Sequence, residues 1–519
     1  MRMLLLCVPW VMVNALSSNR WTRTLSSSTA LHSSLRFYYK KSAILPHHSV
    51  PSLQALASEN DDVTSTSSDS SGPMEEENNS STEKVNDDTL TPGSSLADCI
   101  FGVAKTMLGT GILALPGGLA ATSDFPSMLW PANILMLAMG ALSGYTFSLY
   151  GRMAFRTKTK TLDSMWATIF RKENSNTKSI RKDNTSLPIS VVNLIYCYGC
   201  CLTFLLVIAD TLTSLTMLAS PSGLPWWASR PSLIFTVSGG CLWPLCNLKS
   251  LQALAPVSIV GVLGCLVSTA FVVLRCPLVI KSSPYTAASA QFSTYNRVRG
   301  PAPLVLFSMG CVALMAHISA PAFLDSLMPK NADGTTADKN DRQTLRRFNL
   351  MTVLSYALVA ALDAVCLTFG FLTFGGRSAG IVLNNYAPTD WGAALSRFLT
   401  AVSVGGSFPI LFDAARSSAL DMFGGTRRAW TTGLLTSLTA IAMLVKNAGF
   451  VVSFNGALMG TAILYIFPAL MFLRLTAGEG RRRIERLFCR FLVGFGTVAA
   501  LIGAATTVMN TYFPHLLIG

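Results

Sequence analysis

The chain carries little charge for its length: only 13% of its 519 residues are Asp, Glu, Lys or Arg, while 50% are hydrophobic. Soluble domains carry about 25% charged residues, so the composition argues against a soluble protein and indicates a membrane protein. Histidine is also scarce, with 5 residues. There is no HExxH motif, no convincing Ser-His-Asp order and no phosphate-cradling glycine loop. We therefore expect neither an enzyme nor a cofactor or metal site.

The net charge of +14 does not point to nucleic acid, because the basic residues are spread through short loops between apolar stretches, where they set membrane orientation. The 12 cysteines lie mostly inside apolar stretches and behave there as small hydrophobic residues. Cys197 and Cys200 have the spacing of a redox or metal motif, but no second pair and no nearby histidine accompany them. We expect them to pack between helices.

The first 93 residues differ from the rest of the chain. Residues 1–15 have an early arginine and a short apolar run, which predict a signal peptide. Residues 16–58 contain no Asp or Glu and many serines, the composition of a transit peptide. Residues 59–93 hold ten acidic residues and one lysine, which indicate a disordered linker. The membrane domain is therefore expected over residues 94–519.

The order of a signal peptide followed by a transit-like segment resembles the bipartite presequences of algal plastids that lie inside extra membranes. We expect the plastid envelope as the location of this integral multi-pass protein. A vacuolar or other endomembrane location remains the alternative, and a mitochondrial one is a third.

Eleven apolar stretches are candidates for crossing a bilayer, which takes about 20 residues as a helix. They cover 96–121, 127–151, 188–213, 231–248, 252–275, 302–325, 348–375, 391–414, 430–446, 448–473 and 490–513. Basic residues concentrate in alternate loops, among them 152–187 and 326–347, so these loops are expected on one side of the membrane. The loop at 276–301 disagrees, because it is expected on the other side and still carries three basic residues.

The first stretch contains Gly109-Thr110-Gly111 and then Pro116. Glycine costs about 1 kcal/mol relative to alanine inside a helix, and proline about 3. Unwound backbone at membrane depth is tolerated only where it is buried in protein or lines a cavity. Secondary transporters bind small solutes at such interrupted helices. The sequence therefore predicts a transporter whose binding site includes this segment.

Several ordered motifs then identify a resemblance to the amino acid/auxin permease family, which includes the vacuolar and system-A/N-type amino acid transporters. The motifs are Val103–Pro116, Phe307–Gly310 with His317 and Pro321, Leu372–Gly375 with Ile381–Tyr386, Phe408-Pro409 with Ala415-Arg416, and Gly449–Ser453 with Gly456, Gly460 and Pro468–Leu470. The resemblance covers about residues 94–515. It implies an all-α membrane protein with eleven transmembrane helices in a leucine-transporter-like five-plus-five inverted repeat.

The resemblance also implies a symporter of neutral amino acids that works as a monomer in the lipid bilayer. We expect the first and sixth stretches to be unwound near Gly109–Gly111 and Phe307–Gly310. Amides at a half-helix N-terminus suit the substrate carboxylate, and freed carbonyls suit its ammonium group. The expected substrate-binding residues are Thr106, Gly109, Thr110, Gly111, Ile112, Phe307, Ser308, Met309 and Gly310. The hydroxyls of Thr110 and Ser308 could instead bond to their own helices.

Six further residues are candidates for ion coupling or gating: Lys105, Asp210, His317, Asp363, Ser403 and Ser407. An acid inside a membrane helix has a functional role by default, but Asp363 departs from the family's usual apolar residue and could be part of a buried polar pair. Lys105 could extend to the interface, and Asp210 could be a gate or a structural cap. In this fold, the Ser403 helix can help to form a sodium site. By analogy with organelle members of the family, we expect co-transported H⁺ rather than Na⁺.

Three other functions compete with amino acid transport. A transporter of another small organic solute in the same fold is the main alternative. A channel would need rings of charge or a filter in an oligomer, which the asymmetric interruptions disfavour. A membrane-embedded enzyme lacks a recognisable motif.

Deletion of residues 16–58 tests whether this segment targets the protein to its membrane. Deleting it should move a fluorescently tagged protein away from its normal membrane and leave transport by the purified protein unchanged, because the segment lies before the membrane domain. Unchanged location in cells, scored by microscopy, would contradict the hypothesis.

Overall fold

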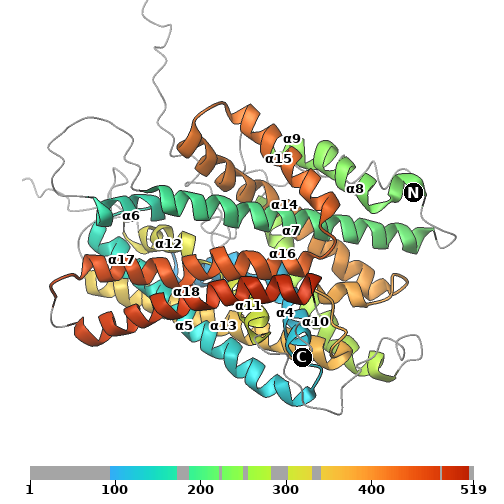
Figure 1. The fold of residues 1–519 in the computed structure, drawn as a ribbon, viewed down its shortest axis with the longest axis horizontal. Helices are drawn as coiled ribbons and strands as arrows, with labels where there is room; N and C mark the ends of the chain where they lie inside the picture. Colours follow the sequence, from blue (N-terminus) through green and yellow to red (C-terminus); the bar gives the residue numbers. More distant parts are fainter. Residues whose placement is uncertain are drawn as a thin grey trace, which may run out of the picture.

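The computed structural model describes residues 94–171, 186–220, 225–248, 255–281, 302–329, 341–479 and 482–513. Every element in these ranges is a helix, which confirms the all-α expectation. The long helices run roughly along the longest axis of the molecule (Figure 1). The proposed signal peptide, transit segment and linker at 1–93 lie outside the described residues.

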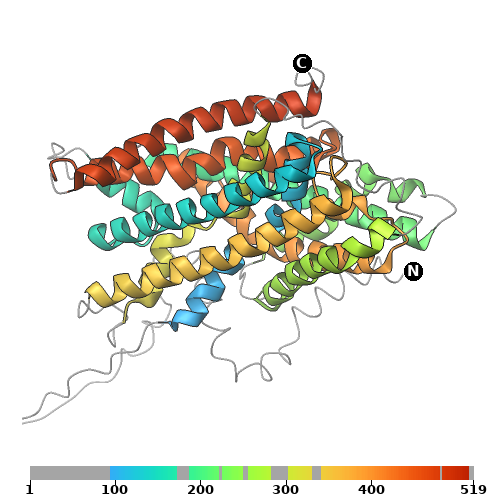
Figure 2. The same ribbon diagram turned by 90° about the horizontal axis from the view of Figure 1, so that it is seen from below.

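Six long helices form the frame of the bundle: α5 (Leu129–Thr157), α7 (Leu187–Ala219), α10 (Ala255–Lys281), α13 (Asp341–Phe374), α14 (Trp391–Phe423) and α18 (Arg483–Tyr512). Shorter α-helices lie between them: α3 (Leu96–Met107), α4 (Thr110–Thr122), α6 (Leu162–Phe170), α8 (Arg230–Thr236), α9 (Trp243–Cys246), α11 (Pro303–Ala313), α12 (Ala320–Leu327), α15 (Arg427–Leu444), α16 (Ala448–Asn455) and α17 (Phe467–Leu475). Figure 2 shows α18 along one face of the bundle and α10 along the opposite face.

Short 3₁₀-helical and π-helical segments interrupt or join these α-helices. The 3₁₀ segments are η1 (Pro126–Met128), η3 (Trp226–Ala228), η7 (His317–Ser319) and η8 (Val382–Asn385). The π-helical segments are η4 (Val237–Leu242), η9 (Gly456–Gly460) and η10 (Ala462–Ile466). Such π turns inside a helix often mark functional positions, and η9 packs directly on α11.

Fewer helices in the described ranges qualify as membrane spans than the eleven that the sequence predicts. Among the described residues, eight helical segments are long and apolar enough to cross a membrane, and the bent pair α3–α4 makes nine. All eleven predicted stretches contain helix. The two shortest do not qualify, because 231–248 is divided among α8, η4 and α9, and α15 begins with two arginines. The count of eleven crossings is therefore not confirmed.

Ion pairs show which helix ends lie on the same side of the bundle. Lys160, just after α5, lies 3.1 Å from Asp325 on α12. Near the same end of α5, Arg156 lies 3.0 Å from Glu479, just after α17. The carboxyl ends of α5, α12 and α17 therefore meet at one end of the bundle, which we call the basic side. The end of α10 lies at the opposite end, where Arg275 pairs with Asp390 at the start of α14.

Glycines allow close helix packing along two seams. A Cβ at Gly140 would lie 2.7 Å from the Ala360 Cβ, which brings α5 against α13. A Cβ at Gly456 would overlap the Ser308 carbonyl oxygen, which brings η9 against α11. Small residues at such positions let membrane helices approach closely, so these glycines have a packing role.

Replacing Gly456 with valine tests this packing. The new side chain would overlap the backbone of α11, and overpacking typically costs about 1–3 kcal/mol or more. Gly494→Val on α18 is the matched control, because a Cβ there has nothing within 4 Å. We expect the melting temperature in detergent to fall for Gly456→Val and to stay near wild type for Gly494→Val. Equal melting temperatures for the two variants would refute the packing role.

Candidate substrate site at two helix interruptions

The first predicted helix is interrupted where the glycines indicated. Helix α3 ends at Met107, α4 begins at Thr110, and the two helices are bent by 49°. Gly109 is extended, with φ −159° and ψ −155°, and no side chain caps the start of α4. The first amides of a helix have no partner within it. The amides of Thr110, Gly111 and Ile112 are therefore the free positive end of α4.

The interruption of the sixth predicted helix lies later than expected. Helix α11 runs unbroken to Ala313, the chain unwinds at Leu314–Ala316, and α12 begins after the turn η7. The prediction of an unwound segment at Phe307–Gly310 is therefore wrong. The reason is packing: a Cβ at Gly310 would lie 2.8 Å from the Met139 Cε, so this glycine serves helix contact with α5.

Helices α4 and α11 lie antiparallel and in close contact. The Thr122 hydroxyl donates to the Ala302 carbonyl at one end of the pair, 3.2 Å away. At the other end, a Cβ at Gly111 would lie 2.8 Å from the Ala313 Cα. The amino end of α4 therefore meets the carboxyl end of α11. These two ends carry partial charges of opposite sign.

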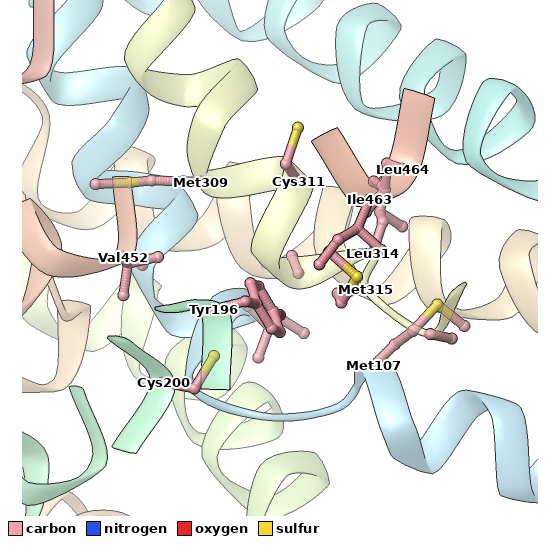
Figure 3. Packing of buried hydrophobic residues seen from close by; sticks show 14 of the residues in the cluster. Met107, Tyr196, Cys200, Met309, Cys311, Leu314, Met315, Val452, Ile463 and Leu464 are labelled. Carbon is pink, nitrogen blue, oxygen red and sulfur yellow. The ribbon is translucent and has the colours of Figure 1, made fainter. Parts of the chain in front are cut away.

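A cavity of about 270 Å³ lies at this meeting point. Its lining comes from the α3–α4 break, from α7, from the end of α11, from α14 and from α16, and it includes Thr106, Gly109, Thr110, Gly111, Tyr196, Cys200, Met315, Ala316, Ile410, Val452 and Asn455. Figure 3 shows Met107, Tyr196, Cys200 and Met315 around the segment that joins α3 to α4. The volume suits a small solute, since it is near the lower end for ligand pockets.

The cavity extends toward the basic side. Asp163 on α6 and Asp421 near the end of α14 line that part of it. On the opposite side, the chain is tightly packed: a Cβ at Gly380 would lie 2.7 Å from the Gly449 Cα. There, the Arg230 side chain also donates to Asp210 at 2.8 Å.

Four of the nine expected substrate-binding residues line this cavity: Thr106, Gly109, Thr110 and Gly111. Ile112 is buried in the core just behind them. Phe307, Ser308, Met309 and Gly310 lie within α11 and outside the cavity lining. The Ser308 hydroxyl donates to the Leu304 carbonyl of its own helix at 2.6 Å, which was the alternative considered for it.

The six coupling and gating candidates lie outside the cavity lining. His317 is fully buried, and its Nε2 lies 2.9 Å from the Thr146 hydroxyl. Its Nδ1 lies 3.3 Å from the Tyr356 hydroxyl. These contacts hold η7 against α5 and α13, so the geometry favours a positioning role for this histidine.

Three more candidates have identifiable surroundings. Asp210 pairs with Arg230 and also accepts from the Asn384 amide at 3.2 Å. A Cβ at Gly261 would lie 2.8 Å from the Ser403 Oγ, so Ser403 faces α10. Ser407 donates to the Ser403 carbonyl of its own helix. The two serines are therefore not assembled around the cavity as a ligand set.

Lys105 and Asp363 complete the six. Lys105 lies in the last turn of α3 and makes no ion pair with a described residue. Asp363 is 1% exposed within α13. No group of three or more His, Cys, Asp or Glu that could hold a metal occurs in the described part of the chain.

Sequence reasoning missed the contributions of α7 and α16. Tyr196, Cys200 and Asn455 line the cavity, and the Asn455 amide donates to the Tyr196 carbonyl at 3.0 Å. Cys200 was expected only to pack between helices. The available signals were polar residues in apolar stretches: Asn193 and Thr203 on α7, and Asn455 directly before Gly456.

Comparison with known proteins decides the family. The family described as "Transmembrane amino acid transporter protein" matches residues 92–321 and 338–513. The chain belongs to this family. The match confirms the resemblance found in the sequence and indicates a multi-pass membrane transporter rather than an enzyme.

Two relatives match this chain over most of their own length. The chain is 22% identical over 435 residues to sodium-coupled neutral amino acid transporter 7 of Xenopus laevis, covering 80% of this chain and 88% of that one. It is 23% identical over 459 residues to the Homo sapiens protein of the same name, covering 82% and 89%. A crystal structure of MhsT in complex with L-phenylalanine aligns with a TM-score of 0.47 at 10% identity, over 80% of this chain and all of that one.

Proposed function

We propose that this family member is a secondary active transporter of neutral amino acids. The observation that carries the proposal is the meeting of two helix ends of opposite polarity at one cavity. The free amides of Thr110–Ile112 suit a carboxylate, and the carbonyl end of α11 near Ala313 suits an ammonium group. A free amino acid carries both groups on one carbon atom.

The remaining walls of the cavity favour a neutral side chain. Met107, Met315 and Val452 come from three different segments and line the same cavity as Gly109 with apolar side chains. Flexible methionine side chains adapt to apolar ligands of different shape. The charged residues of the lining are Asp163, Asp421 and Asp413. Asp163 and Asp421 line the part toward the basic side, and the charge of Asp413 is paired with Arg416 and Arg427. The names of the relatives, which are neutral amino acid transporters, support this assignment.

The arrangement of the cavity supports transport by alternating access. The route to the basic side is lined by polar residues, whereas the opposite side is closed by the contact of Gly380 with Gly449 and by the Asp210–Arg230 pair. We propose that the structure is the state that faces the basic side. Opening toward the other side requires the Asp210 contacts to separate, which gives Asp210 a gating role.

We propose that a cation gradient drives uptake and that H⁺ is the coupled ion, although the relatives are named sodium-coupled. We further propose a monomer that lies in an organelle membrane, with the plastid envelope as the location suggested by residues 1–58. Transport of another small zwitterionic or carboxylated solute is the alternative function. Uptake assays with a panel of amino acids and organic acids distinguish the two.

Gly109→Val tests the site directly. A Cβ at Gly109 has nothing within 4 Å, its extended backbone accepts any residue, and the position lines the cavity. The valine should therefore occupy substrate space without disturbing the fold. We expect at least a ~10-fold loss of neutral amino acid counterflow in proteoliposomes, corresponding to about 1.4 kcal/mol, with an unchanged melting temperature.

Gly433→Val on α15 is the matched control, because a Cβ there also has nothing within 4 Å and the position lies outside the cavity lining. Gly111 is unsuitable for this test, since a side chain there would collide with the backbone at Ala313. Wild-type counterflow by Gly109→Val would show that the site lies elsewhere.

A further inference from the structure

Asp363 is the buried acid that the substrate cavity leaves unexplained. It lies in the middle of α13 and is 1% exposed. Neither of its carboxylate oxygens has a hydrogen-bond partner among the described residues. A buried charge without a partner is strongly unfavourable, whereas the neutral acid is tolerated. The alternative of a buried polar pair therefore has no support in the described contacts.

The packing register places Asp363 beside the break of the first helix. The Ser355 hydroxyl on α13 donates to the Ile100 carbonyl on α3. Further along, a Cβ at Gly370 would lie 2.5 Å from the Pro116 Cγ on α4. The segments therefore run parallel between these contacts. Asp363, eight residues after Ser355 and seven before Gly370, lies at the level of Leu108–Gly109.

Asp363 also lies on the face of α13 that contacts the broken helix. It precedes Gly370 by seven residues. This spacing is about two helical turns, so both residues lie on nearly the same face of α13. Gly370 is the residue in contact with Pro116 of α4. The break therefore has the substrate cavity on one side, where Gly109 lines it, and α13 with Asp363 on the other.

The titratable groups around Asp363 are few. Cys366 on α13 is close enough to interact electrostatically with both Asp363 and Cys265 of α10. On α3, the nearest is Lys105, which makes no ion pair in the described residues. Helix α4 contains no titratable residue. On α5, the contacts of Gly140 with Ala360 and of Asn133 with Thr368 place Leu137 and its apolar neighbours at this level.

We propose that Asp363 binds and releases the proton that drives substrate movement, which deepens the proposed function and rests on it. A proton needs a single carboxylate oxygen, whereas sodium is held by several oxygen ligands, and the titratable neighbours named above are two thiols and one amine, which supply no oxygen ligand. The O–H bond forms with a proton from one compartment and breaks when the proton leaves to the other. The protonated acid is compatible with the packed break, and loss of the proton favours rearrangement of the break toward water.

The test compares Asp363→Asn with wild type in proteoliposomes. Asparagine has the shape of the neutral acid but cannot release a proton. We expect wild type to accumulate a neutral amino acid when an inward proton gradient is imposed. Accumulation by Asp363→Asn under the same gradient should be at least tenfold lower. Counterflow without a pH gradient should remain in the variant, because it needs no net proton movement. Asp325→Asn, whose acid pairs with Lys160 on the basic side, is the matched control and should keep the gradient response.

The outcomes are distinguishable. If Asp363→Asn accumulates the neutral amino acid under the pH gradient as well as wild type does, the proton role is wrong. It is also wrong if a sodium gradient drives accumulation equally in wild type and in Asp363→Asn. A pH-sensitive dye in wild-type vesicles provides a second measurement that holds even if the variant does not fold. Amino acid uptake without internal acidification also overturns the proposal. Absence of any amino acid counterflow by folded wild type would instead reject the proposed function itself.

Discussion

The break in hydrogen bonding between Met107 and Thr110 is the feature on which the rest of the structure depends. Backbone groups freed from a helix cannot face lipid, so other protein segments must surround them. Helices α7, α11, α13, α14 and α16 do so here. The helices that enclose the break also form the walls of the cavity. The unwound backbone needs hydrogen-bond partners for its amides and carbonyls, and a substrate with charged groups supplies them.

The contact of α4 with α11 determines where opposite partial charges lie in the cavity. Gly111 lets the amino end of α4 approach the backbone at Ala313, where α11 ends. A bulkier residue at Gly111 would separate the two ends and weaken the field between them. The close approach therefore has two consequences: it stabilises the helix pair through packing, and it places partial charges of opposite sign a short distance apart. A zwitterion matches that pattern better than a singly charged solute.

Much of this arrangement could be predicted from sequence, but the second interruption could not. Gly109 and Gly111 mark the first break, because glycine and a following proline are unfavourable in a continuous helix. Gly310 carries the same local signal and sits inside the continuous helix α11, since its lack of a side chain is needed for contact with Met139. The true break at Leu314–Ala316 has neither glycine nor proline. Its position depends on contacts of His317 with α5 and α13, which are distant in sequence.

The walls of the cavity were equally hard to predict. The residues that α7 contributes lie in a largely apolar helix, where Tyr196 and Cys200 resemble ordinary packing residues. Which face of α7 meets the break depends on its contacts with α14 and α16, such as the bond from Asn455 to the Tyr196 carbonyl. Conversely, Asp363 was noticed in the sequence because an acid is rare in an apolar stretch. Only the register of α13 against α3 and α4 shows that it lies beside the break.

The central claim is that a neutral amino acid binds where the amino end of α4 meets the carboxyl end of α11. The most direct test is a cryo-electron microscopy structure of the full-length protein with a transported neutral amino acid. The account predicts density for the amino acid in the cavity, with its carboxylate within hydrogen-bonding distance of the amides of Thr110–Ile112 and its ammonium group near the carbonyls at the end of α11. Density at another place, with this cavity unchanged, would contradict it.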